Sequence, residues 1–116
     1  MGDGMRRILA VMAAIATMKN GVLLIDEIEN GLHYASLSVM WKAIFTACKE
    51  YNVQIIAVTH SYECIEAFSK TYDEIEPQGD DIRLYRIDKE DGKHKAFIYT
   101  PQVLKAGIEK DFNLCN

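Results

Sequence analysis

The hydrophobic positions of the amino-terminal third predict a helix followed by a strand. Residues Met5–Met18 are good helix formers and apolar on nearly every side, which predicts a helix buried on more than one face. Asn20-Gly21 is a typical helix end. The run Val22–Ile25 is continuously apolar and stops at Asp26-Glu27, which predicts a parallel strand covered on both faces.

The next segment predicts a second helix, a second strand and a third helix. Apolar residues recur at steps of three and four and predict one face of an amphipathic helix that ends at Tyr51-Asn52: Leu37, Met40, Trp41, Ile44, Phe45 and Cys48. Val53–Thr59 is apolar and rich in β-branched residues, as in a buried strand. A helix is expected from about Tyr62 to Thr71. Alternating strands and helices with short connections predict an α/β fold with a parallel sheet.

The pattern changes after Pro77-Gln78-Gly79. Residues 82–87 alternate in polarity, Asp91-Gly92 provides a tight turn, and residues 96–99 form a second run, which together predict a β-hairpin. Pro101 suits the first turn of a final helix. We therefore expect residues 1–76 to form one part of the domain and residues 77–116 to form a hairpin and helix of the same domain.

Length, composition and charge narrow the class of protein. The chain has 116 residues, 49% hydrophobic, and a formal charge of −4 without a block of like charge. This describes one small domain with no electrostatic footprint for nucleic acid or an anionic membrane, so any nucleic-acid role would be indirect. The most apolar stretch, Ile8–Ala16, is too short to span a bilayer. Three widely spaced cysteines predict neither zinc binding nor disulfides and favour the cytoplasm.

Candidate chemistry follows the two predicted parallel strands. Asp26-Glu27 ends the first strand and Thr59-His60-Ser61 ends the second. In open α/β sheets, ligands bind at this edge. Asp26 suits a hydrated magnesium ion, Glu27 a water molecule, and His60 a phosphate. The simpler alternative is that both acids are merely solvated at a strand end.

Four motifs resemble, in order, the signature motif, Walker B motif, D-loop and switch histidine of ABC-type ATPase heads: Gly2–Arg7, Val22–Glu27, Glu29–His33 and Thr59–Ser61. The similarity covers about residues 2–72. It is greatest to the soluble AAA-type branch related to the overcoming-lysogenization-defect and chromosome-maintenance ATPases. The resemblance implies a partial P-loop NTPase fold.

The resemblance also implies roles for individual residues and a nucleotide. Asp26 would hold Mg²⁺ through water, Glu27 would be the catalytic base, and His60 would contact the γ-phosphate. In this family two heads enclose ATP between them, so a homodimer or other self-association is expected. Backbone amides of the signature turn would meet the phosphate of ATP on the partner head: Gly2, Asp3 and Gly4.

One departure from the family pattern is large. No G-x-x-x-x-G-K-[ST] sequence occurs in the chain, so the Walker A loop is missing. We therefore expect the carboxyl-terminal lobe of an ATPase, inactive by itself, with an upstream or effector protein as a further partner. The family's Walker A strand lies beside the switch-histidine strand. We expect the free edge of Val53–Thr59 to be covered by self-association or by a rearranged hairpin.

Two other functions stay open at this point. One is a non-catalytic module in which the signature turn and D-loop form a dimerisation surface. The other is a metal-dependent nuclease that uses Asp26, Glu27 and Glu29 as a carboxylate cluster. The choice between ATP and GTP, and the process that hydrolysis would drive, are also open.

Overall fold

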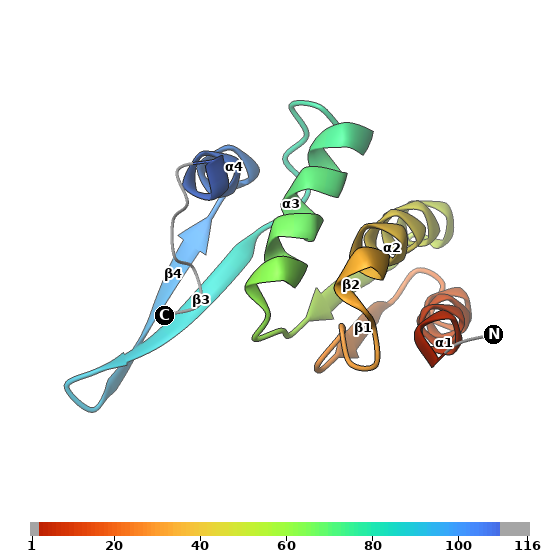
Figure 1. Ribbon diagram of the computed structural model, residues 1–116, viewed down its shortest axis with the longest axis horizontal. Coiled ribbons are helices and arrows are strands. Elements are labelled where there is room, and N and C mark those ends of the chain that lie inside the picture. Colours follow the sequence, from red (N-terminus) through yellow and green to blue (C-terminus); the bar gives the residue numbers. More distant parts are fainter. Residues whose placement is uncertain (1–2, 110–116) are drawn as a thin grey trace.

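The computed structural model describes residues 3–109, so the predicted signature residue Gly2 and the third cysteine, Cys115, lie outside the described residues. The elements follow the predicted order: α1 (Asp3–Thr17), β1 (Val22–Ile25), the 3₁₀ turn η1 (Tyr34–Ser36), α2 (Leu37–Tyr51), β2 (Gln54–Ala57), α3 (Tyr62–Ile75), β3 (Leu84–Glu90), β4 (Lys93–Tyr99) and α4 (Pro101–Glu109). Figure 1 shows α1, α2 and the β1–β2 pair at one end, with the hairpin extending away at the other. The predicted α/β architecture is confirmed.

Strands β1 and β2 pair in parallel, with Leu24 opposite Ile56 and Ile25 opposite Ala57. The connection between them runs through α2, since parallel neighbours cannot be joined by a tight turn. Both strands therefore start at the same end of the sheet and finish at the opposite end. This arrangement brings the residues that follow β1 next to those that follow β2.

Two asparagines fix the start of this parallel pair. Asn20 and Asn52 follow α1 and α2, and both adopt left-handed backbone angles, with φ of 63° and 54°. Asparagine tolerates this conformation better than most residues and is a common helix end. The side-chain amide of Asn52 donates to Asn20 Oδ1 at 3.1 Å, and the Asn20 amide donates to the Tyr51 carbonyl at 3.0 Å. These contacts hold the entry points of both strands together.

The main core lies on one face of the β1–β2 sheet, where α1 and α2 pack against it together with the start of α3. Ile15, Met40 and Ile44 are fully buried there. The Trp41 indole donates to the Cys64 carbonyl at 3.0 Å and so ties α2 to α3. The prediction that α1 is buried on several faces was wrong, since Met5 and Leu9 on its outer side are about half exposed.

The opposite face of the sheet carries exposed apolar side chains and is not covered by any element within residues 3–109. Leu24 is 70% exposed and Ile56 is 48% exposed, and they form a continuous apolar patch with Val22 and Val58. The prediction that both faces are covered was therefore wrong. Exposed apolar patches of this kind mark interaction sites more often than chance.

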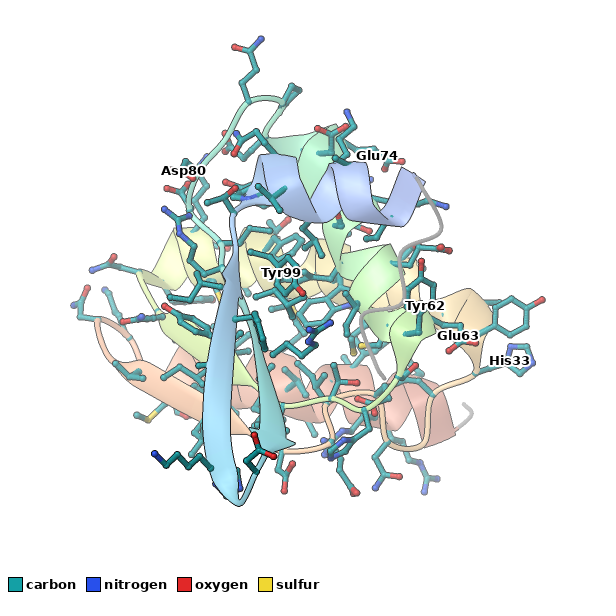
Figure 2. All side chains as sticks on the ribbon, turned by 90° about the vertical axis from the view of Figure 1, so that its left-hand side faces the viewer. His33, Tyr62, Glu63, Glu74, Asp80 and Tyr99 are labelled. Atoms are coloured by element: carbon teal, nitrogen blue, oxygen red, sulfur yellow. The ribbon has the colours of Figure 1, made fainter. Side chains whose placement is uncertain are left out.

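The edge of β2 is open as well. Within residues 3–109, β2 pairs only with β1, and the hairpin strands β3 and β4 pair only with each other. The predicted cover by a rearranged hairpin was therefore wrong. Instead, the hairpin and α4 pack on α3 through Ile65, Tyr99 and Leu104, and Figure 2 shows Tyr99 pointing from β4 into this interior. Self-association over the open edge stays a prediction.

The contrast between the two faces predicts different effects of truncation. Ile44→Ala removes a fully buried side chain and is expected to lower the free energy of unfolding by about 3 kcal/mol. Leu24→Ala on the exposed face is expected to change it by less than about 0.5 kcal/mol. Urea unfolding of the monomeric chain measures both values. A loss at Leu24 as large as that at Ile44 would show that the patch is covered in solution.

Candidate functional site

The candidate site begins where the β1–β2 ladder continues past the strands. The Val58 amide donates to the Ile25 carbonyl at 2.9 Å, and the Ile28 amide donates to the Val58 carbonyl at 3.2 Å. These bonds hold the backbone of Asp26 and Glu27 beside the segment that leads into His60. The side chains of Asp26, Glu27 and His60 are all exposed at this edge.

Glu27 has an unusual backbone conformation. Its φ is 49°, in the left-handed region that costs a residue with a Cβ atom about 1 kcal/mol or more. The Asn30 amide donates to the Glu27 carbonyl at 2.9 Å and closes a turn, while the next residue, Ile28, is fully buried in the core. Non-glycine residues in such strained positions concentrate at functional sites. The buried Ile28 and the closed turn leave the Glu27 carboxylate outside the core.

Arg7 on α1 reaches this turn. Its guanidinium Nη2 donates to the Glu27 carbonyl at 3.1 Å and lies 3.5 Å from the Asp26 carbonyl. The Arg7 side chain is half-buried, and its Nε atom is fully buried without a hydrogen-bond partner. One cation therefore lies against the backbone of both predicted acids. The sequence alone did not indicate this contact, because nothing in an amphipathic helix shows which distant carbonyl a polar side chain will meet.

The residues after β2 are ordered by two hydroxyl groups. The Thr59 hydroxyl accepts from the Ser61 amide at 3.0 Å. The Ser61 hydroxyl accepts from the Cys64 amide at 3.1 Å and so caps α3. Serine is among the best residues for this position. His60 lies between these two anchors, which fix its backbone while its side chain stays exposed.

Cys64 lies behind this loop and is fully buried. Burial raises the pKa of the Cys64 thiol to about 11, and the hydrogen bond with Thr59 lowers it only in part. The thiol is therefore protonated at neutral pH and is no nucleophile. Its role is to pack beneath the loop that holds His60.

The predicted signature and D-loop segments also meet. Gly4 on the first turn of α1 lies against the Gly31 carbonyl, which would be 3.7 Å from a Cβ atom added at Gly4. A surface pocket of about 390 Å³ opens here, lined by Gly4, Met5, Ile8, Gly31, His33, Ser36 and Val39. His33 Nδ1 accepts from the Ala35 amide at 3.3 Å and caps η1. Figure 2 shows His33 at the surface of the molecule. Of the three predicted signature residues, the structure therefore places Gly4 beside the D-loop.

A second surface pocket, of about 320 Å³, lies between the D-loop and the start of α3 and is lined by Glu29, Leu32, Tyr34, Leu37, Ser61 and Glu63. Neither pocket is lined by Asp26, Glu27 or His60, whose side chains are exposed. Across residues 3–109, no group of three or more His, Cys, Asp or Glu side chains is arranged to hold a metal ion. The carboxylate cluster expected for a nuclease is therefore not found in the described part of the chain.

Comparisons with known proteins identify the family of this chain. Residues 1–66 match the family model described as "AAA domain, putative AbiEii toxin, Type IV TA system". The uncharacterized protein MJECL11 of Methanocaldococcus jannaschii is 36% identical over 66 residues, which are 57% of this chain and 58% of that protein. An ATP/GTP phosphatase of Helicobacter pylori is 34% identical over 68 residues, 56% of this chain and 18% of that protein.

A solved structure shows the same fold. It comes from work described as "Structural biochemistry of ATP-driven dimerization and DNA stimulated activation of SMC ATPases", and it superposes with a TM-score of 0.60 at 18% identity. The match covers 96% of this chain and 62% of that one. The chain thus spans 58% and 18% of the two curated relatives that it matches. No helix within residues 3–109 has the length and apolar character needed to cross a membrane. The chain belongs to this AAA-domain family, and its α/β fold is that of the SMC ATPase structure on which it superposes.

Proposed function

We propose that this chain is the carboxyl-terminal lobe of a Mg-ATP-hydrolysing head and supplies Asp26, Glu27 and His60 to the nucleotide site. The observation that carries the proposal is the shared edge: the ladder from Ile25 through Val58 to Ile28 places both acids beside the His60 loop. Family membership makes a nucleoside triphosphate the expected ligand. The left-handed backbone of Glu27 favours a functional site over a merely solvated strand end.

The exposed acids fit a magnesium nucleotide. Mg²⁺ keeps several waters and takes one or two carboxylates, with the rest of its shell supplied by phosphate oxygens. Asp26 offers one such carboxylate at an exposed position after β1. When bound, Mg²⁺ would neutralise charge on the β- and γ-phosphates.

Glu27 and His60 would act on the water and the γ-phosphate. Glu27 orients a water molecule in line with the γ-phosphorus and accepts its proton as the new P–O bond forms and the bond to the β–γ bridging oxygen breaks. His60 donates a hydrogen bond to a γ-phosphate oxygen. The products are ADP and inorganic phosphate, and the proton on Glu27 returns to solvent.

The proposal requires a P-loop segment, because the chain contains no Walker A sequence. Two uncovered surfaces of the described chain lie next to the strand ends that carry Asp26 and Glu27. One is the unpaired side of β2, and the other is the apolar face formed by Val22, Leu24, Ile56 and Val58. A strand of the P-loop segment could pair with β2, and the helix that follows this strand could pack on the apolar face. Together they would bury these side chains and bring phosphate-binding amides to Asp26. The Helicobacter pylori relative, of which the matched residues are only 18%, has room for such a segment.

Self-association is part of the same proposal. Gly4, Gly31 and His33 line one surface pocket, so the signature and D-loop segments form a single surface. The unpaired amides at the start of α1 suit a phosphate. The solved structure of similar fold comes from a study of ATP-driven dimerisation. A second head is therefore the proposed occupant of this surface when ATP is bound, in a soluble cytoplasmic protein.

Another prediction concerns the chain alone. Purified by itself, it is expected to hydrolyse Mg-ATP no faster than buffer, because its sequence contains no P-loop to bind the phosphates. Joined to or co-expressed with a P-loop segment, it is expected to turn over at about 1 s⁻¹ or more, with all activity lost in EDTA. Release of inorganic phosphate measures both. Full hydrolysis by the chain alone would contradict the need for a P-loop.

A further prediction concerns Glu27. In the complemented protein, Glu27→Gln keeps the shape but removes the proton acceptor, and kcat should fall by about 10²- to 10⁴-fold with ATP still bound. Glu50→Gln, at an exposed position on α2, is the matched control and should leave kcat unchanged. Phosphate release and ATP-analogue binding are measured for each variant. Equal kcat for Glu27→Gln and the parent would favour a non-catalytic dimerisation module.

A further inference from the structure

The geometry points to Arg7 as the positioning residue that holds the Asp26–Glu27 turn in its working conformation. The inference rests on the proposed function, in which Glu27 orients the attacking water. Arg7 belongs to α1, and the acids follow β1, so the contact joins segments about 20 residues apart in the chain.

The contact is made with the backbone of the acids. Arg7 Nη2 lies 3.1 Å from the Glu27 carbonyl and 3.5 Å from the Asp26 carbonyl. An ion pair with either carboxylate would occupy the oxygens that water or Mg²⁺ needs. Because the guanidinium binds the carbonyls instead, both carboxylates stay exposed.

The turn requires such support. The left-handed Glu27 is strained, and its carbonyl accepts from both the Asn30 amide and the Arg7 guanidinium. Strained backbone persists only where its surroundings over-determine it. A charge-assisted hydrogen bond is stronger than a neutral one, so the Arg7 bond is the stronger of these two restraints.

The same helix also touches the D-loop. Gly4, one turn before Arg7, lies against the Gly31 carbonyl. A ligand at the start of α1 would therefore act on the helix that carries Arg7. The direction of the Glu27 carboxylate is in this way linked to the surface proposed to meet a second head.

The first test uses the 116-residue chain without nucleotide. NMR hydrogen exchange is measured for the Ile28 amide, which bonds to the Val58 carbonyl, and for the Asn30 amide, which closes the turn. The Ile44 amide of α2 is the reference. Arg7→Gln should speed exchange at Ile28 and Asn30 at least tenfold while Ile44 stays within twofold. Arg7→Lys should give intermediate rates, since an ammonium keeps the charge but not the planar fork. Lys19→Gln, an exposed charge at the end of α1, is the control.

The second test uses the complemented ATPase. Arg7→Gln should lower kcat about tenfold with KM for ATP within twofold of the parent, and Arg7→Lys should recover part of the loss. An unchanged exchange rate at Ile28 and Asn30, a rise in KM alone, or unfolding of both Arg7 variants would overturn the inference. If the unsubstituted complemented protein fails to hydrolyse ATP, the proposed function fails, while the exchange experiment still decides whether Arg7 holds the turn.

Discussion

The candidate site depends on the parallel hydrogen-bond ladder between β1 and β2, because this ladder is what makes two distant segments neighbours. It starts at the paired asparagines Asn20 and Asn52 and continues beyond both strands to the bond between Ile28 and Val58. If the register slipped by one residue, the shifted strand would turn its buried side chains to the exposed face. The acids would then no longer lie beside the His60 loop in their present arrangement.

The described residues form a layered architecture in which helices cover one face of the β1–β2 sheet. Helices α1 and α2 cover one face of the sheet and supply the main core, and the hairpin and α4 build a second cluster on α3. Within residues 3–109, the other face of the sheet and the β2 edge are not part of this core. The chain can therefore fold around one face while the other is left for a further layer. In the proposed head, that layer would also carry the phosphate-binding loop.

Much of the fold could be predicted from the sequence because its signals are local. Asn20-Gly21 and Tyr51-Asn52 mark helix ends, and the run Val22–Ile25 coincides with β1. Whether a short apolar run is covered on one face or two cannot be read from periodicity, since both cases show the same residues. The exposure of Leu24 was for this reason predicted wrongly.

The candidate site, like the fold, could be predicted only in part from the sequence. Asp26, Glu27 and His60 stand out because polar residues end apolar strands, and their roles stay predictions. The left-handed angle at Glu27 and the reach of Arg7 depend on tertiary contacts that no sequence pattern displays. Gly4 and Gly31 were assigned to separate motifs, and only the fold brings them into contact.

The most direct measurement is a crystal structure of the chain complemented with a P-loop segment and bound to Mg²⁺ and a non-hydrolysable ATP analogue. The account predicts the Asp26 carboxylate within hydrogen-bonding distance of a magnesium-bound water and the His60 imidazole against a γ-phosphate oxygen. It also predicts a strand of the added segment paired with β2. A nucleotide bound elsewhere, or an imidazole turned away from the acids, would contradict it.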